Sequence, residues 1–95
     1  MPKVIPGGYE LADMQACTLP EPVDAGFKEV VQHLKGVDYT PVLYVGQQVV
    51  AGMNYMIICR QKPVVLDPLE HLVEFVINRA HTTGDWSLVS IERIV

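Results

Sequence analysis

The sequence predicts one α+β domain over residues 1–95, in which a single α-helix is wrapped by a four- to five-stranded antiparallel sheet in the order β-α-β-β-β-β. Three observations predict this class. One early segment has helical spacing of apolar residues, the later segments alternate as strands do, and only one helix is present to cover a sheet face. With 95 residues, 49% of them hydrophobic, the chain can bury one core.

The first 20 residues contain three prolines and a pair of glycines, without sustained periodicity. Such a segment is expected to start as extended chain and to supply one short strand at most. The helix is predicted next, in EPVDAGFKEVVQHLKG, residues 21–36, where one apolar stripe is formed by Val23, Phe27, Val30, Val31 and Leu34.

The ends of this helix have suitable residues. Pro22 fits the first helical position, and Gly36 fits the C-terminal end. Gly26 weakens a helix by about 1 kcal/mol relative to alanine. We therefore expect the helix to pack closely on a strand at Gly26.

Four strands are predicted after the helix, in TPVLYVGQQVV, MNYMIICRQ, HLVEFVINRA and WSLVSIERIV. The first two can reverse direction only around Ala51 and Gly52. The last two are joined by HTTGD, residues 81–85, where Gly84 can adopt a positive φ. Two valines and an alanine therefore lie at a hairpin turn, a place that usually carries polar residues.

Composition excludes several functional classes. Seven Lys and Arg against eleven Asp and Glu give a net charge of −4, which offers no broad basic surface to a nucleic acid. No apolar run approaches the ~20 residues needed to cross a bilayer, and the first residues lack the apolar segment of a secretory signal. We expect a cytoplasmic protein without nucleic-acid or membrane partners, in which Cys17 and Cys59 stay reduced, although spacing alone does not decide whether they are bridged.

The hairpin sequence resembles that of a known family. Residues 48–60, QVVAGMNYMIICR, are similar to the central hairpin of the cystatins, most closely the stefin-type branch of intracellular, disulfide-free cysteine protease inhibitors. VIPGG, residues 4–8, is similar to the stefin N-terminus, and Trp86 lies just after the HTTGD turn, where cystatins have their second binding hairpin. Asp85 departs from the proline that precedes this tryptophan in many secreted cystatins.

The resemblance implies a reversible, competitive inhibitor of papain-like cysteine proteases of the cathepsin class, active as a monomer and without enzymatic activity or cofactor. It also implies that three segments on one edge enter the protease active site. These are an N-terminal trunk, the first hairpin and the second hairpin, represented by Val4, Ile5, Pro6, Gly7 and Gly8, by Gln48, Val49, Val50, Ala51 and Gly52, and by Trp86. Valines have few rotamers to lose on docking, and glycine permits the turn.

Other functions are less well supported by the residues. A thiol–histidine enzyme is disfavoured because Cys59 has the apolar Ile57 and Ile58 beside it and no local feature expected to lower its pKa. A metal site is disfavoured because the three histidines lack ligand spacing. A cystatin-fold binding or scaffold module that inhibits nothing stays open as the alternative. Exchange of the exposed hairpin between two copies could give a domain-swapped dimer, with the inhibitory surface buried.

Overall fold

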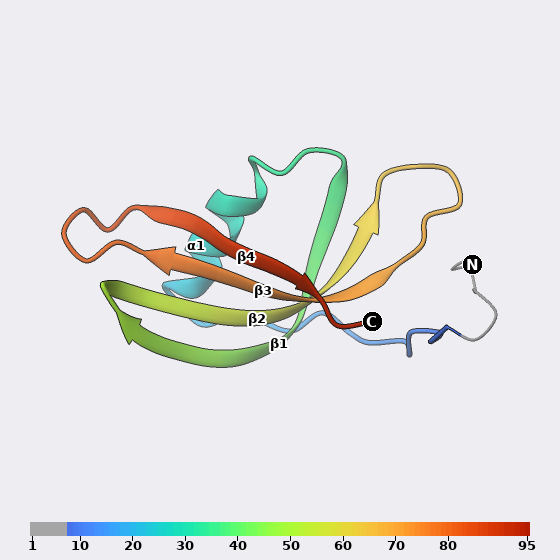
Figure 1. The fold of residues 1–95 in the computed structure, drawn as a ribbon, viewed down its shortest axis with the longest axis horizontal. Helices are drawn as coiled ribbons and strands as arrows, with labels where there is room; N and C mark the ends of the chain where they lie inside the picture. Colours follow the sequence, from blue (N-terminus) through green and yellow to red (C-terminus); the bar gives the residue numbers. More distant parts are fainter. Residues whose placement is uncertain (1–7) are drawn as a thin grey trace.

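The computed structural model describes residues 8–95 (Figure 1). It contains one helix, α1 (Val23–Val31), followed by β1 (Val37–Val50), β2 (Gly52–Pro63), β3 (His71–Arg79) and β4 (Trp86–Arg93). The strands form one antiparallel sheet in the order β1-β2-β3-β4, so each pairs with its neighbour in sequence. The predicted α+β class, with one helix and an antiparallel sheet, is confirmed. No helix in the described chain is long and apolar enough to cross a membrane.

The helix is shorter than the sequence pattern predicted. It begins directly after Pro22 and ends at Val31 instead of continuing to residue 36. The N–H groups of His33 and Leu34 donate to carbonyls three residues earlier, at 3.2 and 3.0 Å. This tighter spacing is common where an α-helix ends. Leu34 still packs against the core, so its place in the apolar pattern reflects burial without helical structure.

The core lies between α1 and one face of the sheet. Alternate residues of the two central strands point toward the helix and are buried, namely Tyr55, Ile57 and Cys59 of β2 and Val73, Phe75 and Ile77 of β3. The rings of Phe27 and Phe75 lie 5.2 Å apart across this interface. The alternation of buried and half-buried residues along β2 is the period of two that predicted the strand.

Both cysteines are free thiols. Cys59 is fully buried, whereas Cys17 is half-buried at the margin of the core. Burial raises the pKa of the Cys59 thiol to about 12, and the nearby Cys17 sulfur adds to the increase. Cys59 is therefore a protonated core residue at neutral pH.

No strand precedes α1 within residues 8–22. The segment makes one backbone hydrogen bond to the sheet, in which the Cys17 N–H donates to the Pro41 carbonyl at 2.9 Å. Pro41 has no N–H to donate in return, and β1 is irregular between Pro41 and Leu43, so the ladder does not continue. The sheet thus has four strands, and the part of the expected N-terminal strand in residues 1–7 lies outside the described residues.

The segment before the helix is anchored by side chains instead. Leu19 is buried in the core. On β2, Arg60 donates one hydrogen bond to the Met14 carbonyl at 3.3 Å and forms an ion pair with Glu70 at 2.7 Å. Leu19 and Met14 thus hold the segment against the core and β2, and the Cys17 hydrogen bond to Pro41 covers part of the outer edge of β1.

Candidate functional site

The turn between β1 and β2 is very short. Val50 pairs with Gly52, which leaves Ala51 alone at the tip. The predicted reversal at Ala51 and Gly52 is confirmed. Gly52 has a φ of +108°, a conformation that L side chains rarely adopt. We refer to residues 48–52 as the first bend.

The apolar side chains of the first bend face solvent. Val49 is 78% exposed and Val50 is 42% exposed, and Ala51 is exposed as well. Burial of a valine is worth about 1.5–3 kcal/mol, so the fold forgoes a stabilising contribution at two adjacent positions. Neighbouring apolar side chains kept at the surface are typical of a site that contacts another molecule.

A second loop, residues 80–85, lies against the first bend. Its own backbone closes it, because the Ala80 N–H donates to the Asp85 carbonyl at 2.8 Å and the Gly84 N–H donates to the Ala80 carbonyl at 3.0 Å. A Cβ atom at Gly52 would collide with the carbonyl of Arg79 and lie 3.2 Å from the His81 nitrogen. The two segments therefore touch through their backbones.

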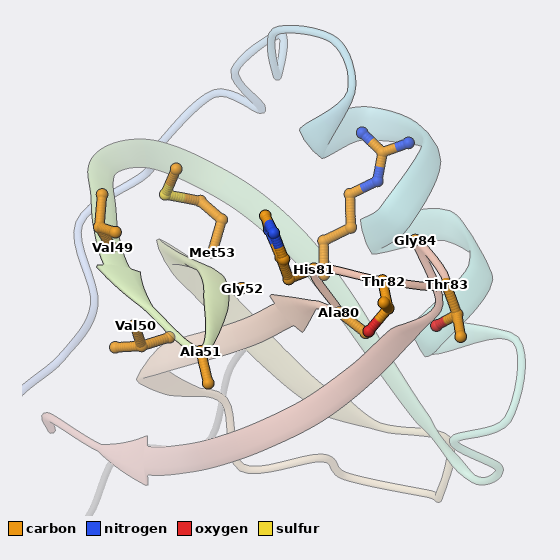
Figure 2. A pocket seen from close by; sticks show the side chains of 11 residues that line it. Val49, Val50, Ala51, Gly52, Met53, Ala80, His81, Thr82, Thr83 and Gly84 are labelled. Carbon is orange, nitrogen blue, oxygen red and sulfur yellow. The ribbon is translucent and has the colours of Figure 1, made fainter.

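An open groove of about 970 Å³ separates the side chains of the two segments. Figure 2 shows the first bend and the second loop facing each other across it. The lining residues come only from these segments and their flanks, namely Val49, Val50, Ala51, Gly52, Met53, Arg79, Ala80, His81, Thr82, Thr83 and Gly84. We refer to this end of the sheet as the two-loop end.

A row of amide side chains crosses the sheet next to the two-loop end. The side-chain amide of Asn78 on β3 donates to Oδ1 of Asn54 on β2 at 2.9 Å, and the Asn54 amide donates to Oε1 of Gln48 on β1 at 3.4 Å. These residues are register partners on the face opposite the helix. The row links three strands and holds Gln48, so the first bend is fixed relative to β3.

Trp86 lies at the base of the second loop, as the first residue of β4, and is half-buried. One face of its ring packs on Gly26 of α1, where no Cβ would fit. Its ring centroid is 5.5 Å from that of Tyr55, and the Arg79 guanidinium lies 5.6 Å from it. The close packing expected at Gly26 is confirmed, and Trp86 connects the second loop to the helix.

Gly8, the one trunk residue that the structure describes, does not lie with the two loops. Gly8 lines a pocket with His71 and Arg93, where β3 begins and β4 ends. At about 3.3 Å per residue, the nine residues of β3 separate this position from the two-loop end by roughly 26 Å. Figure 1 shows the described start of the chain and the two hairpin turns at opposite ends. The expectation of three segments on one edge is therefore wrong for Gly8, and Val4, Ile5, Pro6 and Gly7 lie outside the described residues.

Some residues of the two-loop end were not singled out from the sequence. Arg79 and His81 contact Gly52, and Asn78 completes the amide row. Their signal in the sequence is weak, because it consists only of their position beside the HTTGD turn. Within residues 8–95, no group of three or more His, Cys, Asp or Glu side chains is placed to hold a metal ion.

Comparisons of the chain with protein-family models, with characterised proteins and with solved structures gave no significant match.

Proposed function

We propose that this protein is a reversible, competitive inhibitor of papain-like cysteine proteases, with a cystatin-like fold of the stefin type. The first bend and the second loop would enter the active-site groove of the protease together. The observation that carries the proposal is the exposure of Val49, Val50 and Ala51 at a turn that contacts a second loop. Together with Gln48 and Gly52, the same residues form the pentapeptide that resembles the cystatin first hairpin.

The rigidity of the two-loop end supports this proposal. A protease groove is blocked well by a surface that loses little entropy on binding. The valines have few rotamers, Gly52 is packed against the Arg79 carbonyl, and the amide row holds Gln48. The apolar bend can therefore dock without reorganising, while its tight backbone turn presents no extended peptide bond for cleavage.

The placement of Gly8 favours a second candidate. An inhibitor that uses a trunk and two hairpins needs all three at one end, and Gly8 lies at the other. The alternative is a binding module that presents the same apolar bend to a partner other than a protease. In either case the contact surface is the two-loop end.

Titration of papain with the purified monomer distinguishes the two candidates. We expect competitive inhibition, with activity restored by excess substrate. Full papain activity at about 10 μM protein would exclude inhibition with the affinity of a specific complex and would leave the binding module. Cathepsins of the same class serve as further targets in the same assay.

Val50→Asp tests whether the first bend makes the contact. A charge forced into an apolar groove should weaken inhibition by more than about 2 kcal/mol, a change of roughly 30-fold in the inhibition constant. Val65→Asp is the matched control, because Val65 is 63% exposed in the link between β2 and β3. Equal effects of the two substitutions would show that the bend is not the contact.

A further inference from the structure

The two edges of the sheet are protected to different degrees. The order β1-β2-β3-β4 leaves β1 and β4 at the edges. The β1 edge contains Pro41, has irregularities between Pro41 and Leu43 and between Tyr44 and Gly46, and receives the Cys17 N–H. Proline, bulges and covering segments are the usual ways in which an edge is kept from pairing with another chain.

The β4 edge has fewer of these features. Trp86–Arg93 contains no proline and no lysine, and its only irregularity is a bulge at Val89, opposite the step from Val76 to Ile77. Leu88 is 37% exposed and Val89 is 51% exposed. A groove of about 150 Å³ runs between this edge and α1, and its apolar lining includes Val30, Leu34, Trp86 and Leu88. An extended strand could add to this edge and place a side chain in the groove.

We propose that the β4 edge pairs with β4 of a second copy of this chain. Antiparallel pairing would join two four-stranded sheets into one continuous sheet with two-fold symmetry. A second copy is identified as the occupant because the side chains of β4 complement those of an antiparallel β4. An unrelated peptide would not be expected to show this complementarity.

The side chains complement one another in the register in which Val89 faces Ser90 of the second copy. Leu88 then faces Ile91, and Trp86 faces Arg93. These last four residues all lie on the helix side in the present sheet, since Leu88, Ile91 and Arg93 pair with the buried Ile77, Phe75 and Val73 and Trp86 packs on α1. On the other face, Ser87 faces Glu92. No like charges oppose each other, and the two-fold axis repeats every pair.

The paired dimer differs from a dimer formed by hairpin exchange. Antiparallel β4 strands would place the two-loop ends of the two copies at opposite ends of the joined sheet, so both first bends stay accessible.

The interface is small, because eight residues per copy are fewer than the 20–30 per side of a standard interface. The dimer is therefore weak and reversible, and it forms at about 0.1–1 mM protein.

Sedimentation equilibrium of the full chain tests the proposal. The wild-type protein should show a monomer–dimer equilibrium that relaxes on dilution. Val89→Lys should raise the dimer dissociation constant by about 10-fold or more, because a charged edge resists strand addition. Val45→Lys is the control, because Val45 is a bulged residue of β1, the other edge strand, and has the same 51% exposure. Its dissociation constant should match that of the wild type.

Hydrogen exchange of the wild-type protein gives a measurement that needs no variant. Raising the concentration should slow exchange of amides in Trp86–Arg93 and leave β1 unchanged. The proposal is overturned by a protein that stays monomeric at 1 mM, by equal effects of the two lysine substitutions, or by protection confined to β1 or to residues 64–66. A dimer that forms only after heating and persists on dilution would also overturn it in favour of hairpin exchange. None of these measurements involves a protease, so the outcome is independent of the inhibitor proposal.

Discussion

Gly52 is the residue that joins the two halves of the candidate site. Its φ of +108° makes the turn after Ala51, and its missing side chain leaves room for the Arg79 carbonyl. The pentapeptide glycine therefore has two independent physical requirements. The first concerns its own backbone, and the second concerns a neighbouring segment 27 positions later (79 − 52).

Replacing Gly52 with alanine should lower the free energy of unfolding by about 3 kcal/mol, because the backbone strain of about 1–2 kcal/mol is added to a collision with the Arg79 backbone. Urea denaturation followed by circular dichroism measures this change. Gly36→Ala is the matched control, since Gly36 has a φ of +79° but a Cβ atom added there would meet nothing within 4 Å. Gly36→Ala should lower the free energy of unfolding only by the backbone strain of about 1–2 kcal/mol. Equal losses for the two variants would show that contact with the second loop is unimportant.

Cys59 gives a prediction about reactivity and pH. Because burial raises its pKa to about 12, a thiol reagent at pH 8 should modify only Cys17 in the folded protein. A second thiol should appear when the chain is unfolded. Rapid modification of both thiols in the native protein would contradict the buried position of Cys59.

The same pKa difference sets the direction of a stability change at alkaline pH. The unfolded Cys59 thiol releases its proton near its ordinary value of 9.0, whereas the folded thiol keeps its proton until about pH 12. The free energy of unfolding therefore keeps its full contribution from the buried Cys59 thiol below pH 9, and this contribution is lost as the pH rises toward 12. Urea denaturation at pH 8 and pH 10.5 should show this decrease, and Cys59→Ala should show a smaller decrease.

Among the elements, α1 and β4 are joined by one unusually close contact. Gly26 is buried in the helix and faces the Trp86 ring. An alanine at this position would favour an isolated helix by about 1 kcal/mol. In this protein the added methyl group would displace the indole ring, so packing and helix propensity act in opposite directions.

We expect packing to prevail, so that Gly26→Ala lowers the free energy of unfolding by about 1–3 kcal/mol. Trp86 is the one tryptophan of the chain, so its fluorescence reports the displacement directly. In the background of Trp86→Leu the same alanine should be tolerated, because the ring that it meets is gone. An additive pair of effects would show that the two residues do not interact.

The strands were predictable because their signals are local. β-Branched and apolar residues give β2 and β3 their pattern, and Ala51 and Gly52 are the one place between the first two predicted strands where the chain can reverse direction. The structure extends the first predicted strand to Val37 and the second to Pro63, but it keeps the order and the turns. Pairing each strand with the next needs no information beyond the sequence.

The other features depend on contacts between distant segments. The inward packing of Trp86 requires the helix to pass directly over β4, and apolar spacing does not give that position. The bond between Asn54 and Asn78 requires the register of two strands. The trunk was placed beside the hairpins by family resemblance, whereas the path of residues 14–19 is fixed by Arg60 and Leu19.

For the whole molecule, the sheet separates two groups of exposed apolar residues. One is the first bend, and the other is the link between β2 and β3, where Val64, Val65 and Leu66 are 64%, 63% and 95% exposed. These groups lie at opposite ends of β2, which has 12 residues and spans roughly 36 Å. One protease docked at the two-loop end would leave the other group exposed.

The position of Gly8 leads to a prediction about the N-terminal trunk. Because Gly8 lies beside His71 and Arg93, contact through the two-loop end does not include the described start of the chain. Deleting residues 1–7 should leave the circular dichroism spectrum unchanged and alter the inhibition constant for papain by less than about 3-fold, or about 0.7 kcal/mol. The same deletion combined with Val50→Asp should reproduce the loss caused by Val50→Asp alone. A loss of 10-fold or more on deletion, with the spectrum preserved, would mean that the trunk belongs to the interface and that the start of the chain reaches the two-loop end when the protease is bound.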